Sequence, residues 1–114
     1  MLKLIQWQWE GYTEFHRSRL NLAMHIVLVP GFICANLYLI NSLVNGDYVF
    51  ALLSLATMGL SIALQGIGHK QEPQASIPFT SAWNAVSRLL VEQWINFPRF
   101  VLTGGWWSAL QQAS

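Results

Sequence analysis

The sequence predicts an all-α integral membrane protein with a single domain over residues 1–114. Apolar residues make up 54% of the chain and charged residues only 10%, whereas a soluble domain carries roughly 25% charged residues to keep its surface hydrated. Two long stretches lack charged residues altogether, and a short polar turn separates them. These observations together predict a transmembrane helical hairpin, and the short chain leaves room for one domain only.

The first uncharged stretch predicts a membrane-spanning helix at about 22–44. It supplies the roughly 20 residues needed to cross a hydrocarbon core of about 30 Å. Pro30 and Gly31 lie inside it. In a membrane helix we expect this pair to produce a kink rather than an end, because a neighbouring helix can satisfy the freed carbonyl. The Asn-Gly-Asp sequence at 45–47 then predicts a turn.

The second uncharged stretch predicts a span at about 48–67. Small side chains recur along it, and they let another helix approach closely. They permit a homodimer without requiring one. The small residues are Ala51, Ser54, Ala56, Gly59, Ser61 and Ala63.

Residues 70–82 are polar, contain two prolines and predict a loop, and an amphipathic helix follows at about 81–97. Its tryptophans favour the membrane interface. One side is apolar and the other polar, with Arg88 and Glu92 paired one turn apart on the polar side. The apolar side consists of Trp83, Val86, Leu90, Trp94 and Phe97, and the polar side of Asn84, Arg88, Glu92, Asn96 and Arg99.

The sequences near both termini predict segments that lie at the membrane interface. Pro98 is expected to end or bend the amphipathic helix, and the apolar sequence FVLTGGWWSAL follows it. That segment is too short to cross a membrane unaided, so we favour a surface location over a third span. At the other end, Ile5, Trp9, Tyr12 and His16 share one side of a predicted interfacial helix.

The distribution of cations predicts the orientation. Three cations precede the first span and three follow the second, whereas the turn between the spans holds only Asp47. By the positive-inside rule both termini face the cytoplasm, in a bacterial inner membrane or, in a eukaryote, the endoplasmic reticulum. The N-terminus lacks signal-peptide features and is expected to be mature sequence. The cations are Lys3, Arg17, Arg19, Lys70, Arg88 and Arg99.

The charge and cysteine content exclude other classes. A net charge of +1 provides no basic field for nucleic acid, so no nucleic-acid partner is expected. Cys34 is the only cysteine, so the chain cannot form an intramolecular disulfide. Membrane lipid is the expected surrounding.

The three histidines all fall at one edge of the predicted hairpin. His16 precedes the first span, His25 begins it, and His69 ends the second. A hairpin places the start of its first helix beside the end of its second, so His25 and His69 should be neighbours. His16 can join them only if the chain bends between 17 and 20, because nine residues of straight helix would put it opposite His25.

This arrangement predicts a metal site. Gln65, His69 and Glu72 share one side of a helix, as do Asn21 and His25. Imidazoles with one carboxylate suit non-haem Fe(II) and oxygen chemistry, whereas zinc would use the same ligands to activate water. Ionisable groups in membrane segments are usually functional because burying them is costly. The candidate ligands are His16, His25, His69 and Glu72, and Tyr12, Asn21 and Gln65 are expected to orient imidazoles or substrate.

The motifs resemble those of the 2-hydroxy fatty acid dioxygenase family of small membrane proteins. The matching residues are Tyr12, His16, Asn21 and His25, then Pro30, then Gln65, Gly68, His69 and Glu72, which span about half of the chain. The resemblance implies an Fe(II) cofactor and catalytic roles for His16, His25, His69 and Glu72. It also implies O2-dependent removal of one carbon from a 2-hydroxy fatty acid, with release of CO2 and the shortened acid.

The sequence also offers two candidate residues for binding substrate and leaves two alternative functions open. Arg88 and Arg99 are candidates for binding a lipid carboxylate, although the simpler interpretation is that they extend to the headgroups. One alternative function is a non-enzymatic lipid- or partner-binding membrane protein with structural histidines. The other is a haem protein with two histidine ligands, which a visible spectrum would test.

Overall fold

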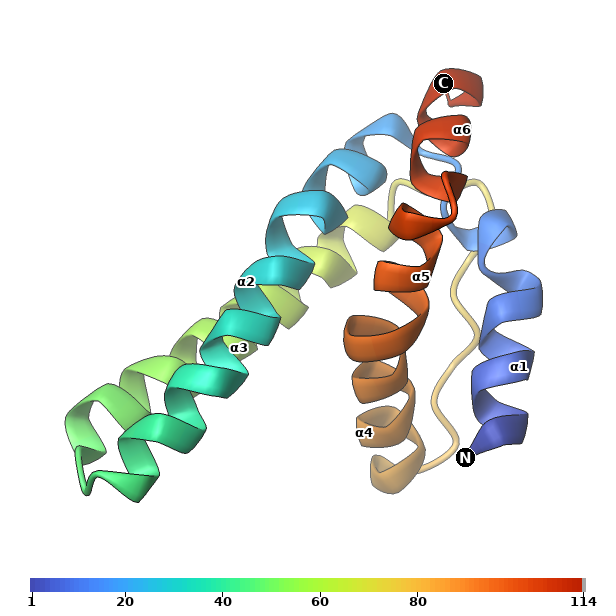
Figure 1. Cartoon of the computed structure of the whole chain (residues 1–114). Coiled ribbons are helices and arrows are strands. Elements are labelled where there is room, and N and C mark those ends of the chain that lie inside the picture. Colours follow the sequence, from blue (N-terminus) through green and yellow to red (C-terminus); the bar gives the residue numbers. More distant parts are fainter. Residues whose placement is uncertain (114) are drawn as a thin grey trace.

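A computed structural model describes residues 1–113, and every regular element in that range is helical (Figure 1). The elements are α1 (Leu2–Gly11), the 3-10 turn η1 (Thr13–Phe15), α2 (Arg19–Val44), α3 (Tyr48–His69), α4 (Ala82–Val91), the π-helical turn η2 (Glu92–Asn96), α5 (Phe97–Leu102) and α6 (Gly105–Gln112). The all-helical prediction is confirmed.

The two long helices α2 and α3 form the predicted hairpin, packed side by side (Figure 1). Side-chain caps fix where each begins. Ser18 accepts a hydrogen bond from the backbone N–H of Asn21, and Asp47 accepts one from that of Phe50. The helix α2 runs through Pro30 without a break. Nearby, the Ser61 hydroxyl of α3 donates to the carbonyl of Leu28 at 2.7 Å, which links the two helices.

Both hairpin helices are long and apolar enough to cross a membrane, and most of their surface is uncovered. Only 22% of the most apolar 18-residue window of each is buried within the chain. The turn end of the hairpin projects away from the other helices in Figure 1. Its exposed side chains there are large and apolar, among them Leu37, Tyr38, Ile40, Leu43, Val44, Tyr48, Val49, Phe50 and Leu52. A helix from the core of a soluble protein would bury this surface.

The remaining helices gather at the other end of the hairpin. The segments α4, η2 and α5 follow one another as a single rod, with α1 beside α4 (Figure 1). Two pairs of side-chain amides join these helices. Gln65 of α3 and Gln93 of η2, both buried, exchange hydrogen bonds of 2.8 and 2.9 Å, and the buried Asn96 amide donates to the half-buried Gln8 of α1 at 2.9 Å.

The apolar side of α4 points outward. Of the predicted apolar side, Trp83, Val86, Leu90 and Trp94 are exposed, but Phe97 is buried. Of the predicted polar side, Asn96 is fully buried and Arg99 is exposed, and the neighbouring Gln93 is also fully buried. The division into an apolar and a polar side therefore does not match a division into buried and exposed residues. The predicted pairing of Arg88 with Glu92 is wrong, because the Arg88 guanidinium binds backbone carbonyls of the loop after α3.

Pro98 does not end the rod, because it occupies the first turn of α5, where a missing N–H costs nothing. The chain turns at Gly104, whose φ of 82° is readily adopted only by glycine. Helix α6 then packs on the start of α2, where the Trp106 indole donates to the Leu22 carbonyl at 2.9 Å.

Candidate metal centre

Four side chains converge where the open end of the hairpin meets η1 and η2. His16, His25, His69 and Glu92 each offer one ligand atom, and these four atoms lie within 4.8 Å of one another. That separation is close to twice a metal–nitrogen bond of about 2.1 Å. The predicted meeting of the three histidines is confirmed. The chain bends between η1 and α2, which lets His16 approach His25 as the spacing required.

The backbone fixes two of the imidazoles in a form suited to metal binding. Nδ1 of His16 lies 2.7 Å from the Tyr12 carbonyl, and Nδ1 of His25 lies 3.0 Å from the Asn21 carbonyl. A carbonyl only accepts, so each Nδ1 carries the proton and each Nε2 presents a lone pair.

Three buried ring nitrogens at the centre have no hydrogen-bond partner among residues 1–113: Nε2 of His16, Nε2 of His25 and Nδ1 of His69. Buried polar atoms are almost always paired, because leaving one unpaired costs roughly 1–3 kcal/mol. Several such atoms converging beside a carboxylate have the chemistry of a ligand set. The donors therefore fit a transition-metal ion.

Glu92 supplies the carboxylate. Its Oε2 lies 3.3 Å from Nε2 of His16 and 3.7 Å from Nε2 of His25. Burial raises the pKa of the Glu92 carboxyl, whereas a hydrogen bond to His16 and positive charge at the imidazoles lower it. A bound cation would supply that positive charge while the imidazoles stay neutral, and it would keep Glu92 ionised, as a metal ligand must be.

Tyr12 contacts both Glu92 and His16. Its hydroxyl donates to Oε2 of Glu92 at 3.0 Å, and its ring stacks on the His16 imidazole with centroids 3.9 Å apart. Burial, together with the charge and hydrogen bond of Glu92, raises the pKa of Tyr12 well above its usual value. The phenol therefore stays protonated and holds the carboxylate in place, close to the orienting role predicted for Tyr12.

Glu72 was predicted as the carboxylate ligand, and the structure corrects this. Both oxygens of Glu72 are occupied at the start of α2: they accept from the backbone N–H of Arg17 at 2.6 Å, from that of Ser18 at 3.0 and 3.1 Å, and from the Asn21 amide at 2.6 Å. A carboxylate is favoured there because the free N–H groups and the helix dipole attract negative charge. Glu72 thus fastens the end of α3 to the start of α2.

Asn21 serves the same junction. Its side chain binds Glu72 while its carbonyl orients His25, so its predicted orienting role agrees with the geometry. Gly68 makes this contact possible, because a Cβ at residue 68 would lie 2.5 Å from the Asn21 amide oxygen. The glycine before His69 thus lets α3 approach α2 closely enough to bring His69 to the centre.

Gln65 makes no hydrogen bond to an imidazole in the described residues, but it lines the cavity, so a role in orienting substrate stays a prediction. Its amide is engaged by Gln93 and Ser61. It lies on the predicted side of α3, but that side also faces η2, and the buried amide of Gln93 takes up its hydrogen bonds. Gln65 therefore acts by fixing η2, which carries Glu92, against α3.

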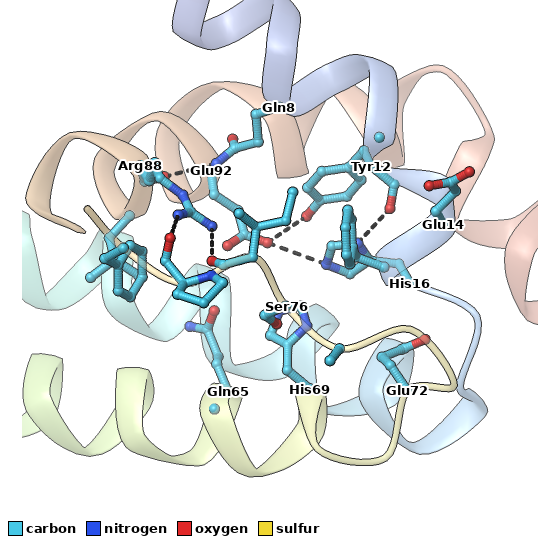
Figure 2. Close-up of a pocket in the computed structure, with 18 of the residues that line it drawn as sticks. Gln8, Tyr12, Glu14, His16, Gln65, His69, Glu72, Ser76, Arg88 and Glu92 are labelled. Carbon is cyan, nitrogen blue, oxygen red and sulfur yellow. Dashed lines mark hydrogen bonds and ion pairs between the residues drawn. The ribbon is translucent and has the colours of Figure 1, made fainter. Parts of the chain in front are cut away.

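A cavity of about 950 Å³ opens beside the centre (Figure 2). His16, His69 and Glu92 contribute to its wall, whereas His25 is fully buried behind them. Much of the wall is apolar and includes Trp7, Phe15, Ile62, Ile77, Phe79 and Leu89. Charged side chains also line it, namely the cations Lys70 and Arg88 and the carboxylates Glu10, Glu14 and Glu72. The cavity has the size of a ligand site, with a wall that is partly apolar and partly charged.

Of the two arginines predicted to bind a carboxylate, only one lies at the cavity. Arg88 lines the cavity, as Figure 2 shows. Arg99 does not line it and instead stacks on Trp9, 4.0 Å from the ring centre. Arg88 therefore remains a candidate for an anionic ligand and Arg99 does not.

The geometry disfavours the haem alternative. The three histidine rings lie only 4.8 to 5.1 Å apart, centroid to centroid, and meet edge to face. A haem would have to lie as a plane between two of them, and these mutual contacts leave no gap for a macrocycle. A single ion fits the same space.

The sequence contains a signal for Glu92 that spacing from the histidines does not reveal. Arg88, Glu92 and Asn96 form a polar stripe on a helix whose other side is rich in tryptophan. In a membrane protein such a stripe should face the interior, where an acidic residue is a candidate ligand. The π-helical turn brings Glu92, Gln93 and Asn96 inward together, and π-helical turns are frequent at functional sites.

The chain matches no protein-family model, and no significant similarity links it to a curated protein or to a solved structure. The function therefore has to be inferred from the site itself.

Proposed function

We propose that this protein is a membrane-bound, Fe(II)- and O2-dependent enzyme that shortens 2-hydroxy fatty acids by one carbon. The observation that carries the proposal is the convergence of three partnerless, buried imidazole nitrogens with a carboxylate beside a ligand-sized cavity. Nitrogen and oxygen ligands with positions left for substrate are typical of non-haem iron sites that react with O2. The motif resemblance supports the same reaction.

Membrane location is part of this proposal. The exposed apolar surface of α2 and α3 would be costly in water and is stable in lipid. The cations lie on both sides of the hairpin sequence and are missing from its turn, which favours cytoplasmic termini. The metal centre is then at the cytoplasmic edge of the bilayer.

The cavity suits an amphiphilic substrate. Its apolar residues can cover the first part of an acyl chain, with the 2-hydroxyl directed to the histidines and Glu92 and the carboxylate to Arg88, all of which line the cavity except the buried His25. The proposed reaction converts the 2-hydroxy acid and O2 into the acid one carbon shorter, CO2 and water. Bound Fe(II) supplies the redox chemistry with O2.

The protein's own residues prepare the site. Tyr12 holds the Glu92 carboxylate, and the carbonyls of Tyr12 and Asn21 fix the lone pairs of His16 and His25. Glu72 and the Gln65–Gln93 pair hold together the three segments that carry the ligands. Such rigid support keeps ligands in place and raises metal affinity.

The test is turnover by the protein purified in detergent and loaded anaerobically with Fe(II). After addition of O2 and a long-chain 2-hydroxy fatty acid, mass spectrometry should find the acid one carbon shorter, with CO2 in equal amount. Zn(II)-loaded protein is the matched control, because zinc occupies such ligands but has no redox chemistry. Product that forms equally with zinc, or after chelation, would overturn the proposal. Bound iron without product would leave a metal protein whose substrate is different.

A further inference from the structure

A strap of seven residues, 73–79, closes one side of the cavity. It connects α3 to α4, and residues 75–79 line the cavity together with His69 and Glu92. All of its residues are exposed, and within residues 1–113 no backbone–backbone hydrogen bond reaches it. Segments with so few buried contacts and hydrogen bonds open at low free-energy cost.

One side chain fastens this strap. The Arg88 guanidinium donates to the carbonyl of Ile77 at 2.8 Å and to that of Pro78 at 3.2 Å, and it lies 4.4 Å from the Phe79 ring centre. On α1, Trp7 packs near the same guanidinium at 5.2 Å. In the described chain these two are the only hydrogen bonds that the strap makes to the rest of the protein. Figure 2 shows Arg88 and its two bonds at the cavity wall, on the same side as Glu92.

The bonds that Arg88 makes are exchangeable. Its partners are neutral carbonyls, whereas a carboxylate accepts both donors of a guanidinium at once in a bond about twice as strong. Arg88 lies one helical turn before Glu92, and both side chains reach the cavity. A carboxylate that enters the cavity therefore competes with the strap for Arg88.

We propose that Arg88 determines the specificity of this cavity for carboxylate amphiphiles and couples binding to opening. In the ligand-free protein it holds the strap closed. An entering carboxylate takes its place among the Arg88 donors, the carbonyls of Ile77 and Pro78 are released, and the strap opens beside the acyl chain. The inference rests on the proposed function for its choice of a carboxylate, but its test requires no turnover.

The experiment uses the full chain loaded with Fe(II) under anaerobic conditions in detergent, with palmitic acid or the neutral palmitamide as probe. Palmitic acid lacks the 2-hydroxyl and so binds without reacting. The rate of proteinase K cleavage within 73–79 reports strap opening. Palmitic acid should raise that rate about tenfold, as expected for exchange of two charge-assisted hydrogen bonds, and palmitamide should not.

The variant Arg88→Gln should show the faster cleavage without any ligand, no further increase with palmitic acid, and no preference for the acid over the amide. Arg99→Gln is the matched control, since Arg99 also stacks on a tryptophan but lies away from the cavity. It should behave as the wild type. If Arg88→Gln binds no iron and is therefore misfolded, Arg88→Lys, which keeps the charge but loses the paired donors, should show intermediate strap cleavage.

Three results would overturn the inference: wild-type cleavage in Arg88→Gln, equal effects of acid and amide, or loss of acid preference in Lys70→Gln instead, since Lys70 is the other cation of the cavity wall. The outcomes separate the two proposals. Acid-dependent opening without turnover keeps the Arg88 inference and refutes the reaction. Turnover together with strap cleavage that does not depend on Arg88 keeps the proposed reaction and refutes the Arg88 inference.

Discussion

Replacing each of two glutamates by glutamine and comparing the two variants tests the site most sharply. Glu72 and Glu92 are both acids near the histidines, yet the geometry places Glu72 at the start of α2, where it binds backbone N–H groups, and makes Glu92 the candidate ligand. We predict that Glu72→Gln lowers stability and leaves the metal affinity of the folded protein unchanged. Glu92→Gln should instead lower metal affinity by at least about 100-fold, more than the 10- to 100-fold typical of residues that only support a ligand.

The stability cost of Glu72→Gln follows from its contacts. The carboxylate accepts from two backbone N–H groups and from the Asn21 amide. A glutamine keeps one acceptor oxygen but turns an NH2 group toward the other donors. Losing one charge-assisted bond costs roughly 1.5–3 kcal/mol, and losing the charge at the helix start a further 0.3–1 kcal/mol or so. We expect about 2–4 kcal/mol in all, or roughly a 30- to 900-fold change in the folding equilibrium.

The assay is SDS-induced unfolding of the metal-free protein in mixed micelles, followed by helical circular dichroism, with an anaerobic Fe(II) titration of each variant. Loss of iron binding in folded Glu72→Gln, together with normal binding in Glu92→Gln, would refute the assignment. The same pair also separates structural from catalytic acids, because only Glu92→Gln should abolish turnover without loss of fold.

Three further predictions concern the support of the centre. Gly68→Ala should destabilise the protein by about 1–3 kcal/mol in the same unfolding assay, because the added Cβ meets the Asn21 amide oxygen at 2.5 Å; an unchanged unfolding midpoint would contradict that close approach. Tyr12→Phe should weaken Fe(II) binding about 10- to 100-fold in titration, since the Glu92 carboxylate loses its donor, and wild-type affinity would make the hydroxyl dispensable. His25→Ala should lose iron while remaining helical by circular dichroism, whereas loss of helix would favour structural histidines.

The topology of the site was readable from the sequence. A hairpin brings the ends of its helices together whatever their packing, so His25 and His69 had to meet at its open end. The cap and turn at Asp47 were equally local and were visible in the residues themselves. Features that follow from chain connectivity and helix length, such as which helix ends lie together, can be predicted without knowing the contacts between helices.

The identity of the carboxylate ligand was predicted wrongly, because it depends on how separate helices pack. Glu72 has suitable spacing from His69, but the free N–H groups at the start of α2 capture it. Glu92 lies twenty residues further along, and its approach depends on the docking of η2 against α3 through Gln65 and Gln93. The spacing of residues within one helix does not predict how that helix packs against another.

The sequence grouped Arg88, Glu92 and Asn96 on the polar side of a helix at the membrane interface, without indicating which side of that helix faces the other helices. In water the apolar side of a helix turns inward, whereas in lipid the stripe of Arg88, Glu92 and Asn96 must turn inward instead. The composition that predicted a membrane protein should have set this orientation too. If lipid is assumed to surround this helix as well, Glu92 is expected to face the interior and becomes a candidate ligand.

The most direct test of the central claim is iron-edge X-ray absorption on the Fe(II)-loaded protein, with metal content measured on the same sample. We predict one iron per chain in a shell of nitrogen and oxygen atoms, with the outer scattering of three imidazoles, falling to two in His25→Ala if iron is retained there at high concentration. An iron shell without imidazole scattering, or one that His25→Ala leaves unchanged, would contradict a metal centre built by His16, His25, His69 and Glu92.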